Sequence, residues 1–477
     1  MSPIRPSRIG ALVANLAYDV GAYPWASRER HPARIHHAHP DHLMSARCIA
    51  QIKLSRILAA NALNLMARMG LVVLFTGCAT HGEKKIRMEV APVTAARSPE
   101  FRQAMGAILG PNFIAGNQIT TLANGDQIFP AMLQAIRGAR KSVDFETYIF
   151  WDGEIARQFT AALCERARAG VKVNAILDAQ GTGKMGLANL EAMHAAGIDV
   201  QKYHTLFSLD PRRYNNRTHR KLLIVDGNVG FIGGVGIADI WLGNASNEKQ
   251  WRDNHYRLTG PIVAQLQGLF MDDWLKTKGS ILQGPEYFPP VSRSGPYLAH
   301  AFRSSPRTGE SNIELMYLLA IASARESLLI ENAYFLPDEK TREALMHAAQ
   351  RGVRVEIVMP GKHIDQKLVR LASKRHWPQL LKAGVKIYEY EPSMVHVKLM
   401  IVDGIFTSVG SANFDNRSIR LNDEANLDVL DRRFAAQQRR LFDQDRDRSQ
   451  PATLNDAGKL TLGTPFHQLA GLAASEL

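Results

Sequence analysis

Cysteines are scarce in this chain, and no apolar run approaches the roughly 20 residues that a membrane-spanning helix needs. The three cysteines among 477 residues form neither a C-x-x-C pair nor a regular series, which excludes a disulfide framework and the common cysteine-based metal site. Acidic residues are outnumbered, 45 against 58 lysines and arginines. The resulting net charge of +13 indicates an anionic partner, either an acidic membrane or a nucleic acid. The length predicts two to three globular domains.

A ten-residue stretch occurs twice, as THRKLLIVDG at 218–227 and VHVKLMIVDG at 395–404. In each copy a His and a Lys stand two apart at the head of an apolar run, so on a strand both would project from one face toward one ligand. These residues are His219, Lys221, His396 and Lys398. One copy could be an accident, but duplication favours a functional site. The following Asp226 and Asp403 each precede glycine, which predicts a hairpin turn and an architectural role.

Small residues follow each repeat, at 233–236 and 410–413, where backbone can approach a ligand closely. The composite H-x-K-x4-D-x6-G-S-x-N resembles the signature of the phospholipase D superfamily, in which two such motifs from two lobes face each other across one phosphodiester site. The second copy matches in full and includes Ser411 and Asn413. The first copy has Gly234 and Gly236 instead, so it lacks the side chains that would contact phosphate.

The sequence around the motifs alternates between helical and strand periodicity, which predicts an α/β fold. We expect helices at 126–140, 154–169, 312–324 and 338–350, and strands at 142–150, 171–177, 328–334 and 353–359. The resemblance implies two tandem lobes, 116–290 and 291–477, each a mixed β-sheet flanked by helices, related by a pseudo-twofold axis and sharing one active site. The boundary lies in the Pro/Gly/Ser-rich stretch 279–311, with a strand starting near Tyr297.

A second matched pair follows the motifs and aligns Asp253 with Glu424. A histidine nucleophile needs an acceptor on its second ring nitrogen, and we assign these carboxylates that role; the alternative is a pair of surface carboxylates at strand starts. The first lobe also carries an extra loop, 205–218, before its motif. Its arginines could hold a lipid headgroup over the site or belong to a solvated basic loop; they are Arg212, Arg213 and Arg217.

The front of the chain divides into three segments before the first lobe. Residues 1–43 are rich in Arg, Pro and His, which predicts disorder or a later translation start, with metal binding as the alternative. In 44–78, an apolar run ends in Thr76-Gly77-Cys78 and resembles a bacterial lipobox, so Cys78 would be lipidated in the cell envelope. An uncleaved, membrane-associating helix of a peripheral inner-membrane protein is the alternative. Residues 79–115 are expected to form a tether.

Two histidines and two lysines supply a nucleophile, positive charge for phosphate oxygens and an acid for the leaving group, with no metal or cofactor. By resemblance to the superfamily, His219 is the nucleophile that forms a phosphohistidine, and His396 is the acid and base. The near-symmetry of the two copies leaves the reverse assignment open. The span from about 116 to 445 resembles bacterial cardiolipin synthases. The resemblance implies a phosphatidyltransferase that makes cardiolipin from phosphatidylglycerol, or from phosphatidylglycerol plus another phospholipid, with an anionic phospholipid membrane as partner and no nucleic acid. The alternative is a phospholipase D-type hydrolase or nuclease of the same superfamily. The sequence does not indicate an oligomeric state.

Overall fold

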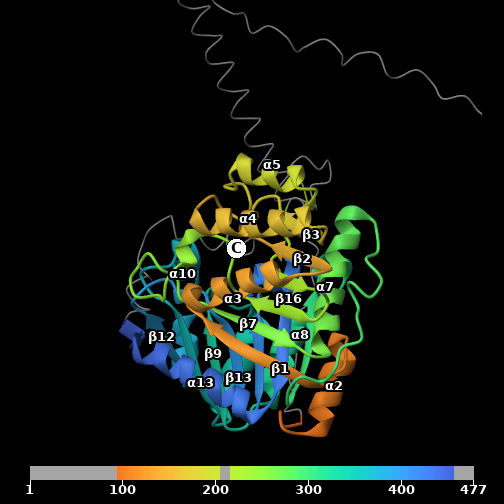
Figure 1. The fold of residues 1–477 in the computed structure, drawn as a ribbon. Coiled ribbons are helices and arrows are strands. Elements are labelled where there is room, and N and C mark those ends of the chain that lie inside the picture. Colours follow the sequence, from red (N-terminus) through yellow and green to blue (C-terminus); the bar gives the residue numbers. More distant parts are fainter. Residues whose placement is uncertain (1–93, 205–214, 456–477) are drawn as a thin grey trace, which may run out of the picture. The chain divides into compact units, whose positions relative to one another are not determined.

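The computed structural model describes residues 94–204 and 215–455, all of which belong to one compact unit (Figure 1). The first lobe contributes seven strands, which are β1 (Ile114–Ala123), β2 (Ser142–Thr147), β3 (Lys172–Asp178), β4 (Asp199–Tyr203), β5 (Leu222–Val225), β6 (Val229–Gly233) and β7 (Asn254–Thr259). Its described helices are α3 (Asn124–Gly138), α4 (Glu154–Arg168), α5 (Leu187–Ala195) and α7 (Ile262–Lys278).

The second lobe has its own set of strands, which are β8 (Tyr297–Ser304), β9 (Ser327–Asn332), β10 (Phe335–Leu336), β11 (Arg354–Pro360), β12 (Lys386–Tyr390), β13 (Lys398–Val402), β14 (Phe406–Gly410), β15 (Phe414–Asp415), β16 (Glu424–Leu430) and β17 (Ser449–Pro451). Its helices are α8 (Asn312–Ser323), α9 (Glu339–Gln350), α10 (Lys367–Lys374), α11 (Trp377–Lys382), α12 (Asn416–Arg420) and α13 (Arg432–Asp447).

The predicted internal symmetry is visible in the strand order of one 15-stranded mixed sheet. Outward from the centre, one side reads β1-β7-β6-β5-β2-β3-β4 and the other reads β8-β16-β14-β13-β9-β11-β12, followed by β17. Each lobe therefore repeats the same succession. The lobes join where β1 pairs with β8 in antiparallel orientation, as a twofold relation requires. The α/β fold class and the two tandem lobes are confirmed.

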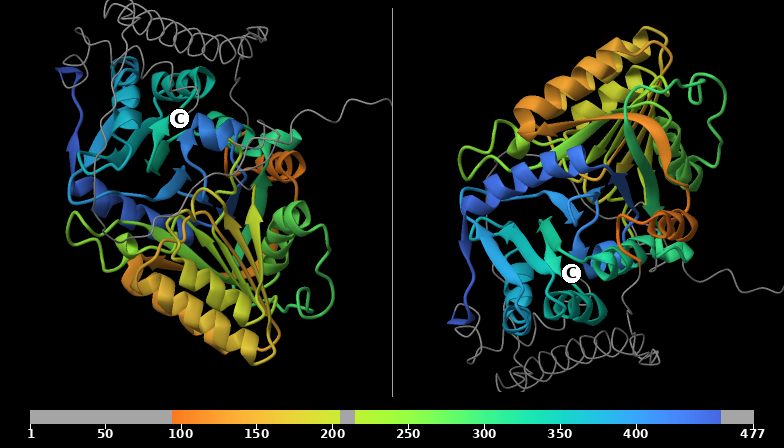
Figure 2. Two further views of the ribbon diagram at one scale, coloured as in Figure 1. Left: turned by 90° about the horizontal axis from the view of Figure 1, so that it is seen from above. Right: turned by 90° about the horizontal axis from the view of Figure 1, so that it is seen from below.

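Three hydrophobic clusters hold this arrangement together. In both views of Figure 2, helices α3 and α4, orange to yellow, cover the face of the first lobe that is turned away from the second. Beneath them lies one cluster, and α8 and α9 cover the corresponding cluster of the second lobe. The third cluster combines strands of both lobes with α7 and α13. Because it contains side chains from both halves, it fixes the lobes against each other.

The eight predicted helices and strands are all present, and their ends agree with the expected ones to within three residues. The expected tether 79–115 is wrong over its described part. Helix α2 (Pro99–Leu109) begins at the cap Ser98 and buries Phe101, Met105 and Leu109 in the core of the second lobe. These three residues are spaced four apart, so they lie on one face of the helix, and that spacing gives the segment an apolar stripe to bury.

Both Asp-Gly pairs form the expected hairpin turns. Asp226 and Gly227 have φ values of 52° and 62°, and Asp403 and Gly404 have values of 49° and 59°. Positive φ at both central positions is the type I′ geometry that matches strand twist. The Asp226 carboxylate also accepts the backbone N–H groups of residues 140–142, and Asp403 accepts those of 325–327. The two aspartates thus tie each hairpin to the start of β2 or β9.

Candidate active site

The two motif histidines do not lie on the strands that follow them. The apolar runs form the strands β5, which begins at Leu222, and β13, which begins at Lys398, so each His precedes its strand. The preceding segments pair instead with the other lobe. The His219 backbone N–H donates to the Asp423 carbonyl at 2.8 Å, and the His396 N–H donates to the Arg252 carbonyl at 2.6 Å. Each histidine is therefore held at the interface between the lobes.

Each imidazole is also bonded to a carboxylate of the opposite lobe. His219 Nδ1 lies 3.0 Å from Glu424 Oε1, and His396 Nδ1 lies 2.8 Å from Asp253 Oδ2. The carboxylates are fully buried, whereas the histidines are 8% and 5% exposed. An ionised carboxylate only accepts, so Nδ1 carries the hydrogen and Nε2 presents a lone pair. The structure thus places both sequence-predicted carboxylates at the ring nitrogens, in a crossed arrangement that the sequence alone did not indicate.

The motif lysines are buried beside the histidines. The Lys398 ammonium lies 3.0 Å from His396 Nε2 and donates to the His396 carbonyl at 2.7 Å. The Lys221 ammonium likewise donates to the carbonyl of His219. Burial lowers the pKa of Lys221 to about 7 and that of Lys398 to about 8, and the charge of Lys398 lowers the pKa of Lys221 further against the opposing effect of Glu424. Both lysines therefore give up their protons more readily than an exposed lysine would.

The environment keeps both imidazoles neutral at pH 7. Burial, opposed by Glu424 and reinforced by the charges of Lys221 and Lys398, lowers the pKa of His219 to about 4. Burial and the same lysine charges place the pKa of His396 well below its ordinary value. A neutral imidazole has a free lone pair, which a nucleophile or a general base requires.

The two carboxylates differ in their hydrogen-bond partners. Burial favours a raised pKa for Glu424, but His219, Lys221 and the Ser411 hydroxyl outweigh it and lower the pKa. Ser411 and Ser418 donate to Glu424 at 2.5 and 2.7 Å. By contrast, burial raises the pKa of Asp253 to about 6. Glu424 is therefore the more firmly ionised of the two.

The departures of the first motif copy have a steric explanation. A Cβ at Gly234 would collide with both carboxylate oxygens of Asp253, and one at Gly236 would come within 2.7 Å of Ile149 Cβ. Asp253 receives a hydrogen bond from Trp241 Nε1 at 3.2 Å, seven residues after Gly234, as Ser418 is seven residues after Ser411. The glycine thus makes room for the carboxylate, and an indole takes the place of a serine hydroxyl as donor.

Ser411 and Asn413, expected at the phosphate, are both buried. The Ser411 hydroxyl is bonded to Glu424, so in this structure it supports the carboxylate. The Asn413 backbone N–H donates to Ser418 Oγ at 3.0 Å, and the side-chain oxygen Oδ1 of Asn413 is buried without a hydrogen-bond partner.

Aromatic and arginine side chains around the imidazoles were not found by sequence reasoning. Ring centroids lie 5.3 to 6.1 Å from the histidine rings, from Tyr148 to His219, and from Trp241, Trp251 and Tyr334 to His396. Arg252 forms a buried ion pair with Asp445 at 2.9 Å, and Arg220 pairs with Asp272 at 2.9 Å. Each arginine neighbours a site residue in the sequence, Asp253 or His219, which was the available signal.

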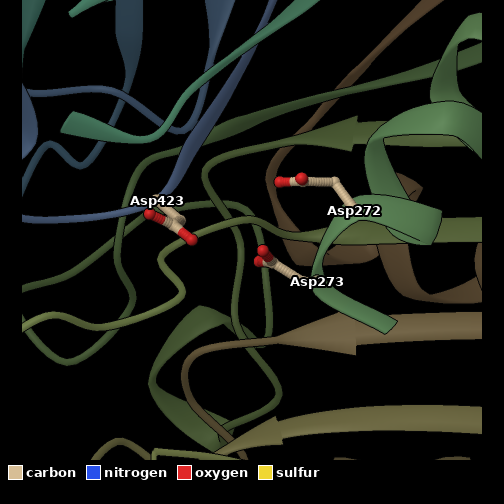
Figure 3. Close-up of side chains that lie close together, drawn as sticks. All are labelled: Asp272, Asp273 and Asp423. Carbon is tan, nitrogen blue, oxygen red and sulfur yellow. The ribbon is translucent and has the colours of Figure 1, made fainter. Parts of the chain in front are cut away.

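Three carboxylates behind His219 lie close together and could in principle hold a metal ion; they are Asp272, Asp273 and Asp423 (Figure 3). The Lys276 ammonium contacts all three, at 2.8 to 2.9 Å. Arg220, which stands between His219 and Lys221 in the motif, pairs with two of these carboxylates, at 2.9 Å from Asp272 and 3.3 Å from Asp273. The protein's own cations thus satisfy these carboxylates.

Of the expected headgroup arginines, Arg212 and Arg213 lie outside the described residues, as does Cys78. Arg217 is 1% exposed, lies 3.9 Å from Asp178 and donates to the His204 carbonyl. It does not belong to an overhanging surface loop, because its guanidinium is buried against protein acceptors. In the described ranges, no helix has the length and apolar character needed to cross a membrane.

Comparison with known proteins identifies the class. Residues 132–274 and 317–446 match the family described as cardiolipin synthase, PLD-like domain. The fold resembles the crystal structure of phosphatidylserine synthase from Haemophilus influenzae, with a TM-score of 0.61 and 14% identity, over 79% of this chain and 99% of that one. The fold and the paired motifs therefore define a two-lobed, phospholipase D-like enzyme.

Sequence relatives are consistent with this class. The chain is 36% identical over 344 residues to a cardiolipin synthase of Geobacillus kaustophilus, covering 72% of this chain and 68% of the relative. It is 35% identical over 323 residues to cardiolipin synthase A of Pseudomonas fluorescens, covering 68% and 67%. The chain belongs to the cardiolipin synthase family with its PLD-like domains, and it is an enzyme of the phosphatidyltransferase type.

Proposed function

We propose that this enzyme makes cardiolipin from two phosphatidylglycerol molecules through a phosphohistidine. The observation that carries the proposal is the crossed arrangement, in which two imidazoles from two lobes are each bonded through Nδ1 to a buried carboxylate. Two presented Nε2 atoms can serve the two ends of an in-line displacement at phosphorus. The names of the relatives support phosphatidylglycerol as the substrate class.

In the first step, His219 Nε2 attacks phosphorus and a P–N bond forms. The P–O bond to the headgroup glycerol breaks, and His396 gives that oxygen a proton. The negative charge of the entering phosphodiester favours the protonated form of a nearby imidazole, so His396 takes up one proton from solvent before the displacement while His219 stays neutral. The lysine ammonium groups, Lys221 and Lys398, face the nonbridging oxygens and stabilise their charge.

In the second step, a hydroxyl of another phosphatidylglycerol gives its proton to His396 and attacks phosphorus. The P–N bond breaks, and cardiolipin leaves with His219 restored. The firmly ionised Glu424 supports His219 as the nucleophile, because a phosphorylated imidazole is cationic and needs a fixed negative partner. The more weakly ionised Asp253 supports His396 as the proton carrier.

The test is to incubate the purified full chain with phosphatidylglycerol vesicles and to quantify the products by mass spectrometry. We expect cardiolipin and free glycerol in equal amounts, with phosphatidic acid as a minor product, and no loss of turnover in EDTA. Phosphatidic acid as the main product would assign a hydrolase. Cleavage of single-stranded DNA without lipid turnover would assign a nuclease.

The enzyme is proposed to work at an anionic membrane of the bacterial envelope, because its substrates are lipids and its net charge is +13. Attachment through a lipid on Cys78 is part of this proposal. Cys78 follows the apolar run 69–75 and the small residue Gly77.

A further inference from the structure

Two exposed leucines follow the equivalent strands β3 and β11, nine residues after the end of the first strand and eight residues after the end of the second. Leu187 is the first residue of α5, and Leu368 is the second residue of α10. These are the first described helices after the equivalent strands β3 and β11. Their exposed fractions are 69% and 46%. A single exposed leucine needs no explanation, but a pair that follows equivalent strands beside one site is informative.

The first leucine begins a helix beside the entrance to His219. The ring of Tyr148 lies 5.3 Å from that imidazole. The loop after β3 packs on the chain next to this tyrosine, since Gly181 leaves no space for a Cβ beside the Tyr148 carbonyl. The Gly181 carbonyl also accepts a hydrogen bond from Trp151 Nε1 at 3.0 Å. The segment 181–187 is thus fixed next to Tyr148, which is half-buried and contacts the His219 ring.

The second leucine has the same relation to His396. The ring of Tyr334 lies 6.1 Å from that imidazole, and its hydroxyl donates to Asp365 Oδ1 at 2.8 Å. Tyr334 also packs against Val369 and Ala372 of α10. Residues 362–368 therefore stand next to the second half-buried tyrosine. We call the two segments, 181–187 and 362–368, the rim.

The exposed charges of the rim are mostly positive. They comprise the lysines Lys184, Lys362 and Lys367 and the acidic Asp365, which is bonded to Tyr334. Lys184 Nζ lies 4.2 Å above the Trp151 ring. Protruding leucines, an interfacial tryptophan and exposed lysines are the combination that binds an anionic bilayer surface, because the apolar tips enter the acyl boundary while the ammonium groups meet the phosphates.

We propose that the rim docks on an anionic phospholipid bilayer, with Leu187 and Leu368 inserted below the headgroups. The site then opens onto the membrane between the two leucines, and both lipid substrates reach the histidines without crossing water. This inference rests on the proposed lipid function, and it adds the surface and the residues that would bind the membrane.

The test compares rim variants with matched variants at the opposite ends of the strands. Leu187→Asp is paired with Ile281→Asp, whose side chain is 67% exposed, and Leu368→Asp with Phe288→Asp, which is 41% exposed. The 281–288 segment is fixed at the starts of β2 and β3, because the Glu286 carbonyl accepts from Ser142 and the Glu286 carboxylate pairs with Lys172. These starts are the strand ends that lie away from Tyr148 and Gly181.

Each full-length variant is assayed for turnover of phosphatidylglycerol in vesicles and of short-chain phosphatidylglycerol below its critical micelle concentration. The readout is the rate on vesicles divided by the rate on the short-chain lipid. Membrane attachment through other parts of the chain affects this ratio equally in all variants. We expect each rim variant to lower the ratio about tenfold, the double variant to lower it further, and Leu→Trp changes at both sites to retain it. The opposite-edge variants should leave it unchanged.

Two results would overturn the docking proposal: an unchanged ratio in the double rim variant, or an equal loss in the opposite-edge variants. Failure of the lipid function would look different, because the unmodified chain would then turn over neither form of phosphatidylglycerol. Co-sedimentation with phosphatidylglycerol vesicles would still decide the docking surface in that case, with the same rim and opposite-edge variants compared.

Discussion

Glu424 lies 205 positions after His219 in the chain, and yet its carboxylate is 3.0 Å from the His219 ring nitrogen. His396 depends in the same way on Asp253, which belongs to the first lobe. Each motif imidazole and the carboxylate bonded to it are therefore contributed by different lobes. Mutations can separate these two roles.

We expect His219→Ala and His396→Ala each to abolish measurable turnover. Asp253→Asn and Glu424→Gln should lower kcat by about 10- to 100-fold, because they loosen an imidazole without removing it. A matched control is Asp428→Asn, which breaks another buried His–Asp pair, 2.9 Å from His300 Nε2. That change should leave kcat within about twofold, provided the variant stays folded by circular dichroism. Equal losses in all three carboxylate variants would speak against an orienting role.

The pH profile should follow the lysines and His219. As pH rises through about 7 and 8, Lys221 and Lys398 lose their protons, so kcat/KM should fall on the alkaline side. As pH falls toward about 4, His219 gains a proton and loses its nucleophilic lone pair, so the rate should fall again. In Lys221→Arg the guanidinium stays protonated, and the alkaline limb should shift to higher pH even if the maximal rate is lower. An unshifted limb would exclude Lys221 as its source.

Restoring the signature serine in the first motif should be harmful. In Gly234→Ser the new Cβ collides with the Asp253 carboxylate, which must move and release His396. We expect a loss in kcat of about tenfold or more with the fold retained. Gly138→Ala is the control, since no atom lies within 4 Å of its added Cβ. Full activity in Gly234→Ser would show that the carboxylate has room that the structure does not reveal.

Arg252→Met should destabilise the protein strongly, because it leaves the carboxylate of Asp445 buried without its cation. Breaking such a buried pair costs about 3–5 kcal/mol. Arg446→Met removes ion pairs at a side chain that is 27% exposed, and it should cost about 1 kcal/mol or less. Urea unfolding followed by tryptophan fluorescence measures both. Similar midpoints for the two variants would contradict the inferred weight of the buried pair.

Membrane attachment through Cys78 predicts a mature protein whose new N-terminus is a lipidated cysteine. Intact-mass analysis of the protein extracted from bacterial membranes should show this form, and Cys78→Ala should leave the precursor unprocessed. A chain that keeps residues before Met66 in its mature form would refute the prediction.

The sequence predicted the parts of the site that repeat, because repetition is visible in one dimension. Aligned copies identified His219 and His396 and placed Asp253 opposite Glu424. Which carboxylate meets which histidine could not be read from them, since the crossing depends on how the lobes pack through α7, α13 and the β1–β8 pair. The apolar stripe of α2 can be recognised in the sequence from its four-residue spacing. The residues against which it packs could not be predicted, because they lie in the second lobe, far along the chain.

Side chains whose partners are distant were missed for the same reason. Arg252 stands next to Asp253 in the sequence, but Asp445, its partner, is 193 positions away. Gly234 indicated only a missing phosphate contact when its own motif was compared with the second copy. It is explained by Asp253, a residue outside that motif, which fills the space that a side chain would take.

The crossed carboxylates also bear on how such a chain can arise and diverge. A gene for one lobe alone would yield no working centre unless two copies of its product associated, because each imidazole would have to borrow its acceptor from a neighbour. Fusion of two such genes links the two lobes covalently, so each imidazole keeps its acceptor. The sequences of the two halves can then diverge. Serine with glutamate on one side and glycine with aspartate on the other are then two inherited solutions to one steric constraint, and each pair can change only as a pair.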